Sequence, residues 1–302
     1  MAERADPARS QRGRLLVVGT PIGNLGDLSP RAAEALRGVD LVVAEDTRVA
    51  ARLLAHAERR PPTVSFNEHN AAGRLPELVA RLVAGQTLAL TTDAGMPGVS
   101  DPGAALVSAA RRAGVSVEVV PGPSAATAAM ALSGMEAAGF LFGGFLPARP
   151  ATARAARLQE LLGAGGNLGL PVVLFEAPHR VADLLGRLTR MAPGAQVAVS
   201  RELSKLHEET LVGAPAEVQA RLGAPRGEFT LVIGGLARTP DSAVDGQALV
   251  EAAHRQAISD RGIVELLRAV GIARRDAYRL VQRPRSANPD ARIDHGVEEI
   301  HE

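Results

Sequence analysis

A single lysine is the most distinctive reactive side chain of this chain of 302 residues. Of the 34 basic residues only Lys205 is a lysine, and it lies in the stretch SRELSKLHEE. A lysine amine can serve as a compact cation or, when neutral, as a proton acceptor, whereas an arginine can only supply charge. We therefore predict a catalytic role for Lys205. The alternative is a lysine left by chance in an arginine-rich composition.

Three charged residues follow a short apolar run, LVVA, early in the chain. They are Glu45, Asp46 and Arg48, within the stretch AEDTR. A carboxylate held in a crevice can act as a general base, so Asp46 and Glu45 are candidate catalytic residues. An ion pair between Asp46 and Arg48 in a solvated loop would explain the same residues without chemistry, and both interpretations stay open.

Three further loops are rich in glycine or proline and nearly free of long side chains. They read GTPIGN, TTDAGMPGVSDPG and PGPSA. The first loop, counted on to Gly26, has its glycines in the spacing G-x-x-x-G-x-x-G and contains no lysine. This pattern matches neither a P-loop nor a dinucleotide fingerprint. Walls of bare backbone suit an uncharged or cationic adenosine cofactor better than a nucleoside triphosphate. A tight turn followed by a helix cap at Ser29-Pro30 is the alternative for the first loop.

The composition excludes several classes of protein. Without cysteine the chain has no disulfide, thiolate zinc site or iron–sulfur cluster, and we predict no metal. No run approaches the roughly eighteen apolar residues of a membrane span, and the polar start MAERADPARSQRGR lacks a signal sequence. We expect a cytoplasmic protein without a membrane partner. A net charge of +1 gives no global sign of DNA or RNA binding, and six Phe, one Tyr and no Trp argue against aromatic base-stacking platforms.

Short apolar runs alternate with helical patterns, which is typical of α/β proteins with a largely parallel sheet. In such sheets ligands bind beyond the carboxyl ends of the strands, where the loops above fall. A first series of predicted strands covers residues 15–18, 41–44, 63–66, 87–91 and 115–119, with helices at 32–36, 50–56 and 75–84. A second series has strands at 139–144, 172–176, 197–200 and 229–234, with helices at 151–162, 181–190 and 216–221.

The two series predict two α/β domains, at residues 14–121 and 122–238, with PGPSAATAA at the junction. Residues 241–283 form amphipathic patterns typical of a small module resembling a helix-turn-helix, with Ser259 as a helix N-cap. The ends, residues 1–13 and 284–302, lack periodicity and are predicted to be disordered tails.

Seven motifs resemble, in order and spacing, the tetrapyrrole-methylase superfamily of S-adenosylmethionine-dependent methyltransferases. The resemblance covers about residues 14–235 and is closest to the branch that methylates ribosomal RNA. The motifs are TPIGNLGDLSPRA, AEDTR, SFNEHN, TDAGMPGVSDPG, PGPSA, FEAPHR and SRELSKLHEE. Thr20-Pro21-Ile22 stands where the tetrapyrrole-modifying branch usually has A-G-P, and this departure fits the RNA branch.

The resemblance implies a cofactor, S-adenosyl-L-methionine, bound in the cleft between the two α/β domains and released as S-adenosyl-L-homocysteine. It also implies 2′-O-methylation of a cytidine in the decoding region of 16S rRNA within the 30S subunit, by a homodimer. The cofactor-binding residues expected from it are Pro21, Ile22, Asp93, Ala94, Gly95, Gly98, Val99, Ser124, Ala125, Phe175, Glu176 and Leu203. The expected substrate-binding residues are Arg48, His69, Arg180 and Arg201.

Simpler interpretations stand beside these residue assignments. Asp93 would serve equally as a turn residue, Ser124 as a helix cap and Arg180 as a surface arginine. For the whole chain, a methyltransferase of small tetrapyrroles such as precorrins would share the fold and the cofactor. A ribosome-assembly factor without enzymatic activity would share the RNA partner.

Overall fold

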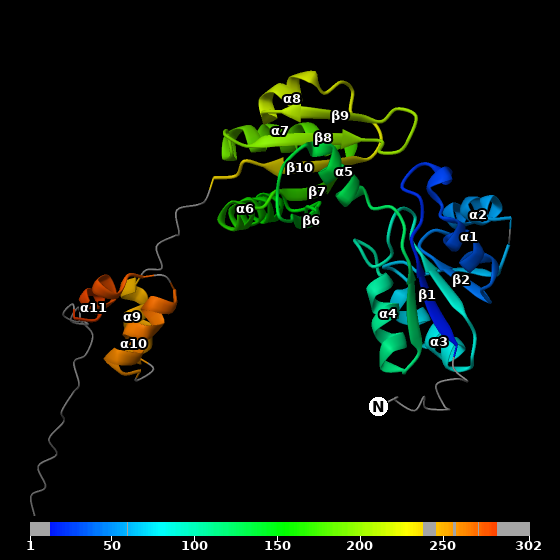
Figure 1. The fold of residues 1–302 in the computed structure, drawn as a ribbon, viewed down its shortest axis with the longest axis horizontal. Helices are drawn as coiled ribbons and strands as arrows, with labels where there is room; N and C mark the ends of the chain where they lie inside the picture. The colour runs from blue at the N-terminus through cyan, green and yellow to red at the C-terminus, as the bar shows by residue number, and fades with distance from the viewer. Residues whose placement is uncertain (1–12, 59, 238–245, 256–257, 271, 283–302) are drawn as a thin grey trace, which may run out of the picture. The chain divides into compact units, whose positions relative to one another are not determined.

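The computed structural model describes residues 13–58, 60–237, 246–255, 258–270 and 272–282 (Figure 1). Contacts divide the chain into two units, Met1–Arg238 and Thr239–Glu302, and each is described by itself. Two tails were predicted, at residues 1–13 and 284–302. All of their residues except Gly13 lie outside the described residues. The division of the first unit at residue 121 stays a prediction.

The first half of the larger unit is a parallel five-stranded sheet in the order β3-β2-β4-β1-β5. Its strands are β1 (Arg14–Val18), β2 (Leu41–Ala44), β3 (Thr63–Ser65), β4 (Leu88–Thr91) and β5 (Ser116–Val120). Four helices cover it: α1 (Pro30–Arg37), α2 (Thr47–His56), α3 (Ala71–Val83) and α4 (Gly103–Arg112). The short 3-10 turn η1 (Leu25–Asp27) precedes α1, which Ser29 caps as predicted by accepting a hydrogen bond from the Ala32 N–H.

Both faces of this sheet are buried at its central strands β1, β2 and β4, which explains why these are apolar runs. On one face Leu16 and Val18 belong to the same core as Leu36 and Leu53 of α1 and α2. On the other face Leu15 packs in the core that contains the buried leucines of α3 and α4. Because successive strand residues point to opposite faces, each of the three central strands contributes to both cores.

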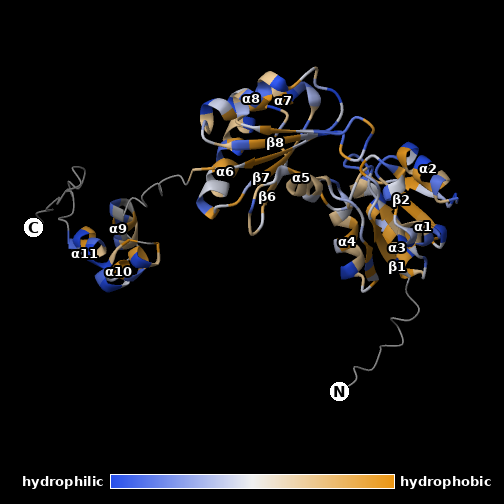
Figure 2. Cartoon of the chain, turned by 45° about the horizontal axis from the view of Figure 1, so that its top comes forward, coloured by the Kyte–Doolittle hydropathy of each residue, from blue (hydrophilic) through white to orange (hydrophobic). Residues whose placement is uncertain are grey.

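The second half holds a mixed five-stranded sheet in the order β6-β7-β10-β8-β9. Its strands are β6 (Leu141–Phe145), β7 (Val172–Glu176), β8 (Gln196–Arg201), β9 (Glu209–Gly213) and β10 (Phe229–Gly234). Helices α6 (Ala151–Leu168), α7 (Pro178–Met191) and α8 (Pro215–Arg221) share one core with it, and α5 (Ala125–Ser133) packs on the opposite face. The apolar strands stand out in the hydropathy colouring of Figure 2.

The predicted strands are confirmed with small shifts, but β9 was not predicted. It pairs with β8 at the edge of the second sheet, and of its five residues only Leu211 is buried. An edge strand that is mostly accessible to solvent does not need an apolar run, so the sequence carried too weak a signal.

The smaller unit contains three helices in its described part, α9 (Gly246–Arg255), α10 (Asp260–Ala269) and α11 (Arg274–Gln282). They enclose a core of their own around Ile263 and Leu267. Ser259 caps α10 as predicted, accepting a hydrogen bond from the Gly262 N–H. In the part of the chain that the structure describes, no helix is long and apolar enough to cross a membrane.

The loop after β1 lies directly against the loop after β5. Gly19 N–H donates to Val120 O at 2.9 Å, and a Cβ atom built on Gly19 would lie 2.5 Å from the Gly122 N atom. A Cβ on Gly122 would in turn lie 2.7 Å from the Gly19 carbonyl carbon. The Gly122 N–H also donates to the Met96 sulfur at 3.3 Å, which brings in the loop after β4. Only glycine allows the three loops to meet at this distance.

We predict that Gly122→Ala destabilises the protein by about 1–3 kcal/mol, since the new methyl group has to displace rigid backbone. Chemical denaturation measures this free energy. Gly73→Ala is the matched control, because Gly73 lies in α3 with no atom within 4 Å of the added Cβ. The control should be neutral or stabilising by roughly 0.5–1 kcal/mol. Equal effects of the two substitutions would show that the contact between the loops does not matter.

Candidate functional site

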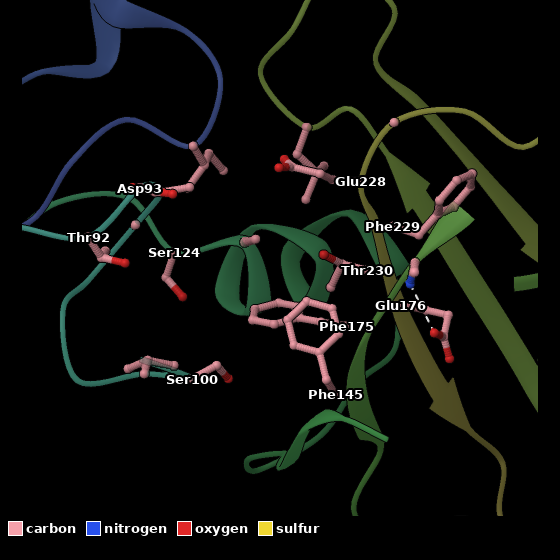
Figure 3. Close-up of a pocket in the computed structure, with 18 of the residues that line it drawn as sticks. Thr92, Asp93, Ser100, Ser124, Phe145, Phe175, Glu176, Glu228, Phe229 and Thr230 are labelled. Atoms are coloured by element: carbon pink, nitrogen blue, oxygen red, sulfur yellow. Dashed lines mark hydrogen bonds between the residues drawn. The ribbon is translucent and has the colours of Figure 1, made fainter. Parts of the chain in front are cut away.

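A pocket of about 450 Å³ is lined by residues from both halves of the larger unit (Figure 3). It lies beyond the carboxyl ends of β2 and β4, and beside the point where the end of β7 pairs with the start of β10. From the first half and α5 its walls contain Ile22, Glu45, Thr92, Asp93, Ala94, Gly95, Met96, Val99, Ser100, Ser124 and Ala125. From the second half they contain Phe145, Phe175, Glu176, Ala177, Pro178, Leu203, Gly227, Glu228, Phe229 and Thr230.

Backbone hydrogen bonds hold the glycine-rich wall of this pocket. Thr20 N–H donates to Gly95 O at 2.9 Å, and Gly95 N–H donates back to Thr20 O at 3.2 Å. Gly95 has a φ of +86°, in the left-handed region that glycine adopts without strain. At Gly95 the wall is therefore made of main chain alone.

Ile22 connects the two halves of the unit. It is 8% exposed and packs in the same core as Leu203 and the buried Val173 and Val232 of the second sheet. Through the single side chain of Ile22, the GTPIGN loop therefore both lines the pocket and packs in the core on the second sheet.

Two acidic residues stand at the carboxyl ends of β2 and β4. The Thr92 hydroxyl donates to Glu45 Oε2 at 2.7 Å, and the Asp46 N–H donates to Asp93 Oδ1 at 3.0 Å. Partial burial, followed by the nearby Glu45 carboxylate, raises the pKa of Asp93. A raised carboxyl pKa in a pocket is the usual property of a group that binds or transfers a proton.

Asp46 is held differently, by the helix that follows it. Its side chain caps α2 by accepting the Arg48 N–H at 2.7 Å, and it pairs with the Arg48 guanidinium at 2.6 Å. The Arg48 side chain, with the helix N–H groups, lowers the pKa of Asp46 to about 2. The ion pair considered as the alternative from the sequence is present, and the low pKa makes Asp46 a weak proton acceptor.

Glu176 is buried at the end of β7 and still lines the pocket. It forms an ion pair with Arg154 of α6, whose side chain is 5% exposed, and it accepts the Ala177 N–H at 2.9 Å. Arg180 lies 3.6 Å from the same carboxylate on the first turn of α7. A buried carboxylate needs such partners, because an unpaired charge would be very costly away from water.

Lys205 stands behind the pocket wall and not in it. Its Nζ contacts Glu202 Oε1 at 3.0 Å and Glu228 Oε2 at 2.9 Å, and Glu228 lines the pocket. Partial burial opposes the charge on the amine, but the hydrogen bonds to Glu228 and Glu202 outweigh it and raise the pKa of Lys205. The amine is therefore an ammonium at neutral pH. This geometry supports a cationic role and opposes a role as a neutral proton acceptor.

The structure brings most of the residues predicted for the cofactor into one pocket. Ile22, Asp93, Ala94, Gly95, Val99, Ser124, Ala125, Phe175, Glu176 and Leu203 line it, as does Glu45. Pro21 and Gly98 do not line it, although each directly adjoins a residue that does.

The residues predicted for substrate all lie outside this pocket. The Arg48 side chain is 87% exposed, and His69 is exposed in the turn before α3. Arg180 faces Glu176, and Arg201 pairs with Glu209 at 2.8 Å. Arg48 and His69 are thus accessible to a partner, although Arg48 also pairs with Asp46, whereas Arg180 and Arg201 are less exposed and each faces a carboxylate within the protein.

The family model for tetrapyrrole (corrin/porphyrin) methylases matches residues 14–219. This range contains the whole first sheet and strands β6 to β9 of the second, and it ends within α8, before β10. The chain belongs to this family. The architecture of two sheets with a pocket lined by both, expected from the motifs, is confirmed for this methylase.

Relatives of this methylase share much of its sequence. A protein named ribosomal RNA small subunit methyltransferase I from Xylella fastidiosa is 44% identical over 76% of this chain and 84% of its own length. Its namesake from Thermotoga maritima is 40% identical over 74% of this chain and 99% of its own length. The one from Mesorhizobium japonicum is 38% identical over 90% of this chain and 92% of its own length, so the likeness continues into Thr239–Glu302.

Solved structures agree on the fold. Diphthine synthase has a TM-score of 0.59 at 15% identity, covering 73% of this chain and 89% of that one. The uroporphyrin-III C-methyltransferase from Thermus thermophilus complexed with S-adenosyl homocysteine has a TM-score of 0.53 at 19% identity, covering 74% and 98%.

The sequence did not single out several lining residues of this methylase. Met96, Ser100 and Phe145 are examples, together with Gly227, Glu228, Phe229 and Thr230 on the second sheet. The stretch after Gly227 begins a predicted strand, β10. Only the antiparallel pairing of β10 with β7 brings the start of β10 beside the carboxyl end of β7, where the pocket lies. A single sequence carries no signal for that pairing.

We predict that Asp93→Asn stabilises the protein at neutral pH. Because the pKa of Asp93 is higher in the folded than in the unfolded protein, ionising this carboxyl lowers the free energy of unfolding. This loss is absent below the ordinary pKa of about 4 and is complete above the pKa of the folded protein. Asn keeps the acceptor for the Asp46 N–H. Thermal denaturation should show a gain in Tm of about 1–3 °C at pH 7 and none at pH 3. Asp183→Asn, on the half-exposed side of α7, controls for loss of a carboxylate. A gain that is equal at both pH values would contradict the raised pKa.

Proposed function

We propose that the chain is an S-adenosyl-L-methionine-dependent methyltransferase that methylates the 2′-hydroxyl of a cytidine ribose in 16S rRNA of the 30S subunit. The observation that carries this proposal is the 44% identity to ribosomal RNA small subunit methyltransferase I across both sheets. The decoding region as target, a homodimer as the working form and the cytoplasm as location belong to the same proposal.

The chemistry of the pocket supports a cationic adenosine ligand. Its lining contains the carboxylates of Glu45, Asp93, Glu176 and Glu228, and among the lining residues described no lysine, arginine or histidine occurs. A nucleotide phosphate would be repelled by this set, whereas a sulfonium and an ammonium group would be attracted. The bare main chain at Gly95 leaves room for a flat adenosine, and Phe175 supplies an aromatic surface.

The residues that would hold the cofactor are the predicted ones that line the pocket, with the glycine-rich wall on one side and Phe175 and Leu203 on the other. When bound, S-adenosylmethionine supplies an electrophilic methyl group. The protein has to orient the ribose hydroxyl and remove its proton. We assign proton removal to Glu45, which lies in the pocket wall, and positioning to Asp46 and Lys205. Asp46 holds Asp93 through its main chain, and the Lys205 ammonium holds the Glu228 carboxylate from behind the wall.

Transfer of a labelled methyl group tests the proposal directly. Purified protein and labelled cofactor are incubated with 30S subunits, with free tetrapyrrole and with neither, and the modified nucleotide is mapped by mass spectrometry. We expect label in 16S rRNA at a cytidine 2′-oxygen. Label in the tetrapyrrole would favour the small-molecule alternative, and binding to 30S without transfer would favour an assembly factor.

We predict that Gly95→Val weakens S-adenosylmethionine binding at least tenfold. The φ of +86° becomes strained, and the new side chain presses on the Pro123 carbonyl oxygen and on Ile22 of the pocket wall, which lie 3.4 and 3.5 Å from the added Cβ. Calorimetry below the melting transition measures the Kd. Gly134→Val is the matched control, since Gly134 also has a positive φ, of +67°, but ends α5 outside the pocket with no atom near its added Cβ. Equal affinities for the two variants would place the cofactor elsewhere.

We predict that Lys205→Arg lowers the single-turnover rate by about a hundredfold, the usual scale for removal of a positioned proton-handling or charge-stabilising group. The stem of Lys205 lies against Gly23, where a Cβ would come within 2.4 Å of its Cγ, so the longer and planar head of arginine has to contact Glu202 and Glu228 in a different geometry. Cofactor affinity and Tm should change little. A variant as fast as the parent, beside an inactive Glu45→Gln, would assign the chemistry to the AEDTR loop alone.

A further inference from the structure

A second hollow adjoins the pocket described above. This groove, of about 530 Å³, is lined by Glu68, Ser100 and Asp101 from loops of the first half and by Phe142 and Phe145 from β6. Ser100 and Phe145 also line the pocket proposed for the cofactor. Anything bound in the groove would therefore lie next to the methyl donor.

A bulge in β6 directs two aromatic rings to the same side. Phe142 pairs with Val173 and Gly144 with Leu174, so Gly143 is an extra residue in the strand. In a regular strand residues three apart point to opposite faces, and one inserted residue reverses that. The rings of Phe142 and Phe145 accordingly both lie beside Phe175, with centroid distances of 5.1 and 5.5 Å.

Phe145 is the exposed member of this aromatic cluster. It is 59% exposed, so one side of its ring is open to a ligand in the groove. Figure 3 shows its ring beside that of Phe175, with Ser100 on the facing wall. The composition argued against a broad aromatic platform, but one uncovered ring is sufficient to stack a single base.

The groove also presents one free carboxylate. The carboxylate of Asp101 accepts the N–H groups of Gly98 and Gly103, at 2.9 and 2.7 Å, and is occupied. Among the described residues no hydrogen bond or ion pair reaches the Glu68 side chain, which is exposed at the rim. A free carboxylate beside an aromatic ring suits a flat ring that bears an amino group.

We propose that this groove binds the base of the target nucleotide, a 4-aminopyrimidine, with Phe145 stacked on the ring and Glu68 accepting from the exocyclic amine. The inference rests on the proposed function, since it places the base beside the methyl donor that acts on the attached ribose. Glu68 is then a specificity-determining residue, because cytosine presents a donor at position 4 where uracil presents an acceptor.

The test compares two substrates and matched variants. Reconstituted 30S subunits carry either cytidine or uridine at the nucleotide that the wild-type protein methylates, and kcat/KM is measured for each. We expect the wild type to prefer cytidine by at least tenfold, a preference that Glu68→Gln reduces about tenfold, since an amide can donate to the uracil oxygen. Glu77→Gln, an exposed glutamate of α3 outside the groove, should keep the wild-type ratio.

Phe145 is tested through the KM for 30S subunits. Phe145→Leu should raise this KM about tenfold and Phe145→Tyr should restore it, since only the tyrosine keeps a ring. Because Phe145 also lines the cofactor pocket, its effect on cofactor Kd is measured separately and should be the smaller of the two.

The outcomes separate the two proposals. If the wild type methylates 30S subunits but Glu68→Gln keeps the same cytidine preference as Glu77→Gln, the groove assignment is wrong and the proposed function stands. If the wild type transfers no methyl group to 30S subunits, both are overturned.

Discussion

The close approach of main chain to main chain at Gly19 and Gly122 is the constraint on which the site depends. The two loops leave adjacent parallel strands, and their backbones touch where any Cβ atom would collide. The loop after β4 joins them through the Met96 sulfur and through the paired hydrogen bonds of Thr20 and Gly95. Because protein interiors are packed as densely as crystals, this three-loop contact fixes the position of one whole pocket wall.

Charge in the pocket is organised in two layers. Carboxylates such as those of Glu176 and Glu228 face the ligand space, and their cationic partners Arg154 and Lys205 stand behind them. The cations hold these acids in place without lining the pocket themselves. A ligand therefore meets acidic side chains whose positions are set before it binds, which is a preorganised site.

The sequence was sufficient for the elements whose signal is local. Buried strands, the Ser29 and Ser259 caps and the glycine-rich loops follow from apolar runs, hydroxyl side chains and missing side chains at single positions. It was insufficient where three-dimensional partners decide. Asp46 and Asp93 are the same residue type in similar loops, yet their pKa values shift in opposite directions, because Asp46 meets Arg48 whereas Asp93 is partly buried beside Glu45.

The same limit explains what was missed on the second sheet. Strand β9 has one buried residue, so no periodic pattern marks it. The direction of Phe145 depends on the register shift at Gly143, which appears only when β6 is paired with β7. Neither feature can be predicted from the local sequence, since both depend on which strands pair and in which register.

The position of Ile22 has a consequence for how the protein is made. This residue belongs to a loop near the start of the chain, but the core it joins includes Val232 of β10, the last strand of the second sheet. At roughly 5–20 residues per second a ribosome exposes the loop long before that strand exists. During synthesis the first sheet can form early, while the core that Ile22 joins stays incomplete until β10 emerges. A nascent chain stalled before β10 would therefore lack both the last part of this core and the pocket wall that begins at Phe229.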